Sequence, residues 1–233
     1  MKKLLLGLLL ISSVLSFGAT QRVGIEKLVT NESRDTLYLE ETKKPYSGEV
    51  ERKYPDGKLL GIATVKDGKF NGKSYEYYEN GKLKIEENYV NGKSEGVSKV
   101  FYPNGKVKYE TPYKNDKKEG VEKFYSENGI LMSEIPFKND VVIGVAKVYN
   151  AQTGKLEYEE NLVNGKRNGL SKKYYPSGKV LNEVNFKDDK EEGIMRVYYE
   201  TGKLQGEIPY KNGQVDGVVK AYDENGKLIE QAT

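Results

Sequence analysis

The side chains that could do chemistry in this chain are carboxylates, lysines and tyrosines. The 233 residues include neither His nor Cys. Their absence excludes Ser-His-Asp triads, Cys-His nucleophile pairs, CxxC redox sites, disulfides and zinc sites built on thiolates or imidazoles. A pair of carboxylates of the kind that glycosidases use remains open on composition alone.

The glutamates do not single out such a catalytic pair. Six of them recur at a nearly constant spacing: Glu86, Glu110, Glu134, Glu159, Glu183 and Glu207. A catalytic pair should break a repeat, whereas these residues follow one. The spaced acidic ligands of a calcium loop are also missing, as is a glycine-rich phosphate loop before a helix. We therefore predict no enzymatic activity, no metal and no cofactor.

The same spacing organises the whole chain. One series of glycines is spaced by 24, 24, 24, 24, 25, 24 and 24 residues: Gly48, Gly72, Gly96, Gly120, Gly144, Gly169, Gly193 and Gly217. A second series follows each first glycine by nine or ten residues: Gly57, Gly81, Gly105, Gly129, Gly154, Gly178, Gly202 and Gly226. Such a phased recurrence is the mark of a repeat architecture.

Each repeat unit reads as a β-hairpin. In one unit, two runs rich in β-branched and aromatic residues, 97–102 and 106–113, flank Pro103, Asn104 and Gly105. This triplet suits a three-residue hairpin loop in which the glycine takes a positive φ. The sequence therefore predicts an all-β protein, an elongated, twisted antiparallel sheet of tandem hairpins of about 24 residues each.

A three-residue loop also predicts the strand register. Phe101 should oppose Val107, Lys99 should oppose Tyr109, and side chains should alternate between faces. Applied to every unit, this register collects the aromatic and aliphatic side chains on one face, with pairs such as Val121–Ile135. It places the glutamate row on the opposite, solvated face. Sheet curling, a second copy or a ligand could each cover the apolar face.

A row of basic residues interrupts the predicted apolar face, with equivalent residues ~10 Å apart on alternate strands. One interpretation is that their methylenes cover aromatic neighbours while the charges reach water. The other is a binding stripe for an acidic or anionic partner. The candidate binding residues are Lys99, Lys123, Lys147, Lys172, Arg196 and Lys220, with the aromatic row Tyr77, Phe101, Tyr125, Tyr149, Tyr174, Tyr198 and Tyr222.

The N-terminus reads as an export signal, residues 1–19. Lys2 and Lys3 precede a short apolar stretch, and the small residues Gly18 and Ala19 offer cleavage sites. Cleavage would lower the basic count from 38 to 36 against 35 acidic residues, a net charge of +1. A nearly neutral chain is a poor nucleic-acid binder. Residues 20–47 would form an N-terminal cap with a degenerate half-repeat, and 48–233 seven full repeats plus a terminal half-repeat.

The unit G-V-x-K-x-Y-x-x-N-G-K-L-x-x-E-x-x-Y-K-N-G resembles MORN-type repeats, and most closely the variant of bacterial YwqK-like proteins, many of which are labelled antitoxins. Residues 72–95, 96–119 and 193–216 carry it well, and the resemblance covers about 36–231. Classical MORN units usually hold a Trp, and this chain has none. The resemblance implies an elongated twisted sheet and a non-catalytic role in protein or lipid contact.

Together these features predict an exported, non-enzymatic repeat protein of the periplasm, cell surface or extracellular space. Its expected partner is another protein or a cell-envelope component. The alternatives are an antitoxin-like protein that neutralises a toxin or effector, and a peripheral binder of anionic lipid at a membrane surface.

Overall fold

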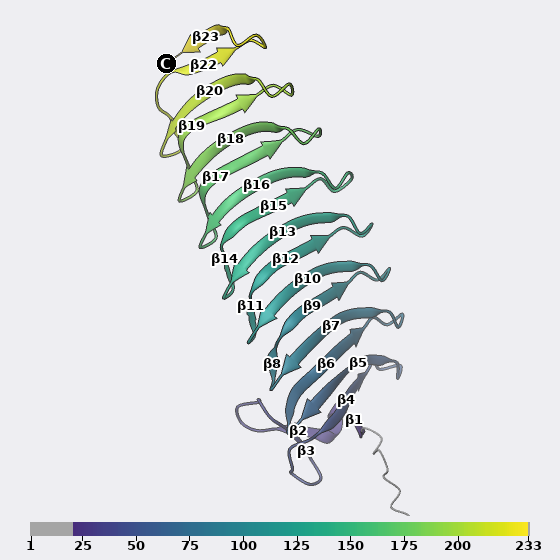
Figure 1. The fold of residues 1–233 in the computed structure, drawn as a ribbon. Helices are drawn as coiled ribbons and strands as arrows, with labels where there is room; N and C mark the ends of the chain where they lie inside the picture. The colour runs from purple at the N-terminus through teal and green to yellow at the C-terminus, as the bar shows by residue number, and fades with distance from the viewer. Residues whose placement is uncertain (1–20, 233) are drawn as a thin grey trace, which may run out of the picture.

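The structure is a computed structural model that describes residues 21–232, and it is dominated by one long sheet (Figure 1). The predicted signal peptide lies outside the described residues. Twenty-one strands form the sheet, and every strand pairing in it is antiparallel except that of β1 with β4. The predicted all-β array of tandem hairpins is confirmed.

Eight hairpins succeed one another along the sheet. Their first strands are β4 (Gly48–Lys53), β6 (Lys69–Tyr77), β9 (Gly96–Phe101), β12 (Gly120–Tyr125), β15 (Gly144–Tyr149), β17 (Lys166–Tyr174), β19 (Lys190–Tyr198) and β22 (Val219–Tyr222). Their second strands are β5 (Leu59–Lys66), β7 (Leu83–Val90), β10 (Val107–Lys114), β13 (Leu131–Lys138), β16 (Leu156–Val163), β18 (Val180–Lys187), β20 (Leu204–Lys211) and β23 (Leu228–Ala232). Four two-residue strands precede a first strand: β8 (Lys93–Ser94), β11 (Lys117–Lys118), β14 (Val141–Val142) and β21 (Gln214–Val215).

Two kinds of tight turn connect these strands. Within a hairpin, Gly105 has a φ of 93°, and the Tyr102 N–H donates to the Lys106 carbonyl at 2.8 Å, as the three-residue loop predicts. Between hairpins, Asn115 and Asp116 have φ values of 49° and 67°. Two successive positive φ values are those of a type I′ turn, which matches the natural twist of the strands that it joins.

A β-bulge in every hairpin corrects the predicted register. Phe101 pairs with Val107 as expected, but Val100 then pairs with Tyr109, because Lys108 is an extra residue without an opposite partner. Lys99 therefore opposes Glu110 rather than Tyr109. The same shift recurs just before the loop in each of the eight hairpins.

The predicted single apolar face is wrong for the same reason. A one-residue shift moves every following side chain of the strand to the other face. The aromatic–aliphatic pairs next to the loops, such as Tyr125–Leu131, are confirmed. Beyond the bulge, however, Val121 opposes Pro136, and Ile135 opposes Glu122. Both faces consequently carry apolar rows, and the glutamates share a face with the basic row.

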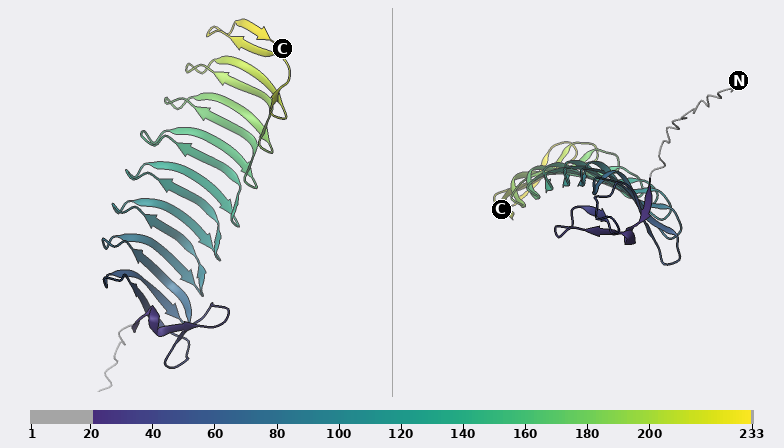
Figure 2. Two further views of the ribbon diagram at one scale, coloured as in Figure 1. Left: turned by 180° about the vertical axis from the view of Figure 1, so that it is seen from behind. Right: turned by 90° about the horizontal axis from the view of Figure 1, so that it is seen from below.

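The sheet is arched, and an N-terminal cap lies inside the arch (Figure 2). The cap comprises β1 (Arg22–Gly24), a 3-10 turn (Ile25–Lys27) and a separate hairpin of β2 (Leu28–Thr30) and β3 (Leu37–Leu39). β3 lies within the segment 20–47 expected to form the cap and the degenerate half-repeat, but among the strands it pairs with β2 alone and stays outside the main sheet.

A small hydrophobic core joins the cap to the sheet. Val23, Tyr46, Val50 and Val65 are buried together, and Leu28, Leu37 and Leu39 pack against them. Val50 and Val65 thereby mark the concave face of the sheet. By register, the face of Lys99, Phe101 and Glu110 is the convex one.

Candidate binding surfaces

On the convex face, each residue of the predicted basic row lies beside a glutamate. The ion pairs are Lys99–Glu110 at 3.1 Å, Lys123–Glu134 at 3.8 Å, Lys147–Glu159 at 3.6 Å, Lys172–Glu183 at 4.0 Å, Arg196–Glu207 at 3.7 Å and Lys220–Glu207 at 4.0 Å. The expected segregation of cations and carboxylates on opposite faces is therefore wrong. The shifted register interleaves them, and the positive row is compensated along its whole length.

The aromatic row of candidate residues joins the same network. Five tyrosines donate their hydroxyls to a glutamate of the preceding unit: Tyr125 to Glu110, Tyr149 to Glu134, Tyr174 to Glu159, Tyr198 to Glu183 and Tyr222 to Glu207. Phe101 has no hydroxyl to donate. Five of the seven residues in the aromatic row thus link neighbouring units through a hydroxyl, although the sequence analysis treated these side chains as apolar.

Burial and hydrogen bonding shift the pKa of Tyr149 and of Glu110. Partial burial, then the hydrogen bond to Glu134, raises the pKa of Tyr149 to about 12. For Glu110, burial raises the pKa, but hydrogen bonds from Lys99 and Tyr125 outweigh it and leave the pKa below its ordinary value. At neutral pH the Tyr149 phenol is therefore neutral and the Glu110 carboxylate ionised, which is the state that their hydrogen bonds require.

A second tyrosine row, which sequence reasoning missed, ties the hairpin loops together. In five hairpins, the tyrosine before the loop donates its hydroxyl to a backbone carbonyl of the next unit, at 2.6–2.8 Å. The members of this row are Tyr54, Tyr78, Tyr102, Tyr175 and Tyr199. Their recurrence at one repeat position was the available signal. Ser126 and Asn150 occupy that position in the two remaining inner units.

Beside the paired charges, the convex face exposes a row of aliphatic side chains. Val97, Val121, Val145, Ile194 and Val218 are each between 41% and 46% exposed. They occupy the same position of their units, so the row runs along the sheet. Leu170, which takes this position in the unit between those of Val145 and Ile194, is half-buried. Exposed aliphatic side chains repeated along one face favour an interaction site.

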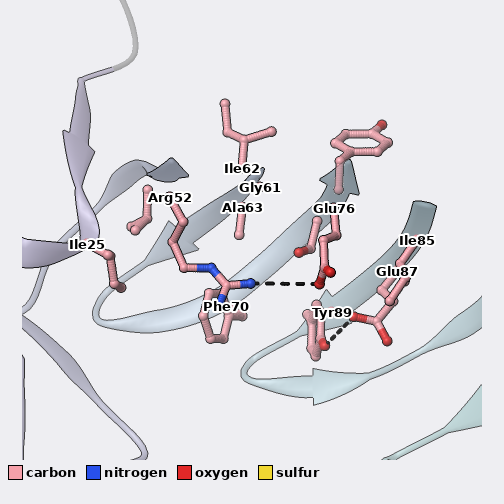
Figure 3. A pocket seen from close by; sticks show the side chains of 13 residues that line it. Ile25, Arg52, Gly61, Ile62, Ala63, Phe70, Glu76, Ile85, Glu87 and Tyr89 are labelled. Atoms are coloured by element: carbon pink, nitrogen blue, oxygen red, sulfur yellow. Dashed lines mark hydrogen bonds and ion pairs between the residues drawn. The ribbon is translucent and has the colours of Figure 1, made fainter. Parts of the chain in front are cut away.

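The concave face holds a pocket of about 360 Å³ beside the cap, shown in Figure 3. Its charged side chains already have partners. Glu76 lies 2.6 Å from Lys84 Nζ and 3.8 Å from Arg52, and Glu87 accepts a hydrogen bond from the Tyr89 hydroxyl at 2.8 Å. Most of the other lining residues are apolar, with Ile25 from the cap on one side. The lining residues of this pocket therefore include no unpaired charge.

Metal binding finds no support in the part of the chain that the structure describes. No group of three or more acidic side chains among residues 21–232 could hold an ion. Within the same residues, no helix is long or apolar enough to cross a membrane.

The comparison with protein families identifies the repeat. The sequence model of the MORN repeat variant matches residues 46–67, 70–91, 94–115, 118–139, 167–188, 191–212 and 215–233, which is more than half of the chain. The chain belongs to the MORN repeat variant family. Proteins of this family are generally non-enzymatic repeat proteins with a binding role.

The other comparisons add little to the MORN assignment. No curated protein matches the chain. Among solved structures, it is similar to an alternansucrase in complex with isomaltononaose, at 15% identity and a TM-score of 0.20. The match covers 85% of this chain and 16% of the alternansucrase chain, and at that score it carries no argument.

Proposed function

We propose that this MORN-repeat protein is exported and, without catalysing a reaction, binds another protein or a cell-envelope component along its convex face. The observation that carries the proposal is the exposed aliphatic row from Val97 to Val218. It runs beside the candidate basic and tyrosine rows, which would form the polar border of the contact. Aromatic and arginine side chains around an apolar centre are typical of protein interfaces.

The ion pairs of the convex face indicate which surface charge a partner should have. Because each basic side chain already faces a carboxylate, the convex face presents alternating charges rather than a positive stripe. A partner with mixed charges around an apolar strip would suit it better than a purely anionic surface. Anionic lipid is thus the weaker alternative, and an antitoxin-like role would use the same face against a toxin or effector.

A site-specific photo-crosslinker tests this surface. The reagent would be placed at Val121 or Val145 in the full chain expressed in a bacterial host, with Asn80, an exposed loop residue, as the matched control. We expect a discrete adduct at both valine positions and none at Asn80. Equal adducts at all three positions, or none at either valine, would contradict the proposal.

Three further measurements separate the alternatives. Fractionation with N-terminal sequencing should find the chain outside the cytoplasm and cleaved after Gly18 or Ala19. An unprocessed cytoplasmic chain would contradict the proposed export.

Once a partner is identified, converting Lys123, Lys147 and Lys172 together to Glu should weaken its binding, and unchanged binding would show that the basic row is not part of the interface. Flotation with vesicles of anionic lipid should leave the protein unbound, and co-flotation would favour the lipid alternative.

A further inference from the structure

A second pocket, of about 240 Å³, lies on the concave face over β16 to β20. It coincides with an irregularity in the repeats. The only 25-residue spacing between leading glycines starts at Gly144, and the matched family segments leave out residues 140–166. Tyr158 and Glu160, which line the pocket, belong to that unmatched segment. The family pattern is therefore broken where this pocket forms.

A buried hydroxyl without a partner faces this pocket. Ser171 is 8% exposed and lines it, and its Oγ has no hydrogen-bond partner within residues 21–232. The other buried hydroxyl residue of the concave face, Thr111, donates to Glu122 at 2.8 Å. An unsatisfied buried polar group destabilises the fold, so a bound ligand that hydrogen-bonds to Ser171 would offset that cost.

Two carboxylates that line the pocket with Ser171 are also without a partner among residues 21–232. Glu160 lies directly across from Ser171 on β16, and Glu191 lies across from Phe186 on β19. Neither carboxylate forms a hydrogen bond or ion pair with another side chain of the described chain, whereas Glu87, at the repeat position of Glu160, accepts from Tyr89. Both are free to bind a ligand cation.

Two cations of β17 face the same pocket from fixed positions. Arg167 lies with its Cζ 4.0 Å from the centre of the Phe186 ring, and its Nε is 3.6 Å from Asp189. Lys173 places its Nζ 5.3 Å from the centre of the Tyr158 ring. Asp189 therefore compensates the charge of Arg167. The aromatic ring beside Lys173 holds that cation in place without neutralising it, which leaves its charge available to a ligand anion.

We propose that this pocket binds a small zwitterion, a free α-amino acid. Its ammonium group would lie toward Glu160, its carboxylate toward Lys173, and Ser171, which lies opposite Glu160 and two residues before Lys173, would hydrogen-bond to one of the two. Val184 and Met195 provide the apolar surface for a side chain. A volume of about 240 Å³ is below the usual range for drug-sized ligands, which limits the occupant to a molecule of this size. The site is independent of the convex face and of its partner.

Calorimetric titration of the full chain with each of the common amino acids tests the proposal. We expect at least one to bind, and its N-acetyl and methyl ester derivatives, which each lack one charge, to bind at least tenfold more weakly. E160Q and K173Q should each weaken binding at least tenfold. E87Q removes a carboxylate from the same repeat position in another unit and should leave binding unchanged.

Circular dichroism and urea unfolding of each variant would show that it is folded before binding is compared. The proposal is overturned if no free amino acid binds to the folded wild-type chain. It is equally overturned if the singly charged derivatives bind as well as the parent amino acid, or if E87Q weakens binding as much as E160Q does.

Discussion

Lys99 Nζ lies 3.1 Å from Glu110 Oε1, across a strand pair in which the two residues are directly opposite. A hairpin with a three-residue loop and no bulge would instead place them on opposite faces. The pair exists because Lys108 is an extra residue in its strand. Repeated in each unit, this one-residue insertion converts two segregated rows of charge into a single compensated network.

Removing one of the tyrosine hydroxyls that connect neighbouring hairpins should lower the stability of the fold. Tyr102 donates to the Tyr125 carbonyl at 2.8 Å, and Y102F would leave that carbonyl with one hydrogen bond fewer. We expect a loss of about 0.5–1.5 kcal/mol in the free energy of unfolding, measured by urea denaturation. Y38F is a suitable control because the Tyr38 hydroxyl forms no hydrogen bond within the described residues. An equal loss in both variants would contradict a specific role for the Tyr102 hydroxyl.

The tyrosine–glutamate hydrogen bonds should make the array sensitive to alkali. The pKa of Tyr149 is about 12 in the folded chain, above the ordinary value of about 10 that it regains on unfolding. Its contribution is therefore complete below pH 10 and is lost as the pH rises from 10 through 12. Phe101 shows that the row accepts Phe, so Y149F should fold.

Urea unfolding of the wild type and of Y149F at several pH values between 8 and 12 checks this expectation. The difference in unfolding free energy between the two proteins should be constant up to about pH 10 and then shrink. A difference that stays constant or widens up to pH 12 would show that the Tyr149–Glu134 contact does not stabilise the fold.

Deleting a single residue should have different consequences in the two strands of one hairpin. Without Lys108, Tyr109 would follow Val107 directly, so Val100–Tyr109 and Lys99–Glu110 could pair as before and on the same faces. Without Val100, Lys99 would follow Phe101 directly, and Lys99 and the strand residues before it would have to exchange faces. We expect the deletion of Val100 to lower the urea midpoint strongly and the deletion of Lys108 to lower it much less. Similar effects of the two deletions would contradict the assignment of Lys108 as the extra residue of the bulge.

The sequence alone predicted the fold, but it did not predict which side chains lie on which face of the sheet. The glycine spacing and the Pro103-Asn104-Gly105 loop predicted the hairpins, because positive φ at such positions is a local requirement. The bulge has no comparable local signal, since Lys108 is an ordinary strand residue. The candidate residues could therefore be found from their repeat position. Their partners, such as Glu110 for Lys99, could not, because simple alternation of side chains without a bulge predicts a pairing that is wrong by one residue.

The shifted strand register can be tested most directly with engineered disulfides. The chain has no cysteine, so a pair of introduced cysteines reports on a single contact. In K99C/E110C the two thiols would lie directly opposite on one face, about 4.5–5.5 Å apart at Cβ, whereas in K99C/Y109C they would point to opposite faces. Under mild oxidation we expect rapid disulfide formation in K99C/E110C and little in K99C/Y109C. Faster disulfide formation in K99C/Y109C would contradict the register in which Lys99 lies opposite Glu110.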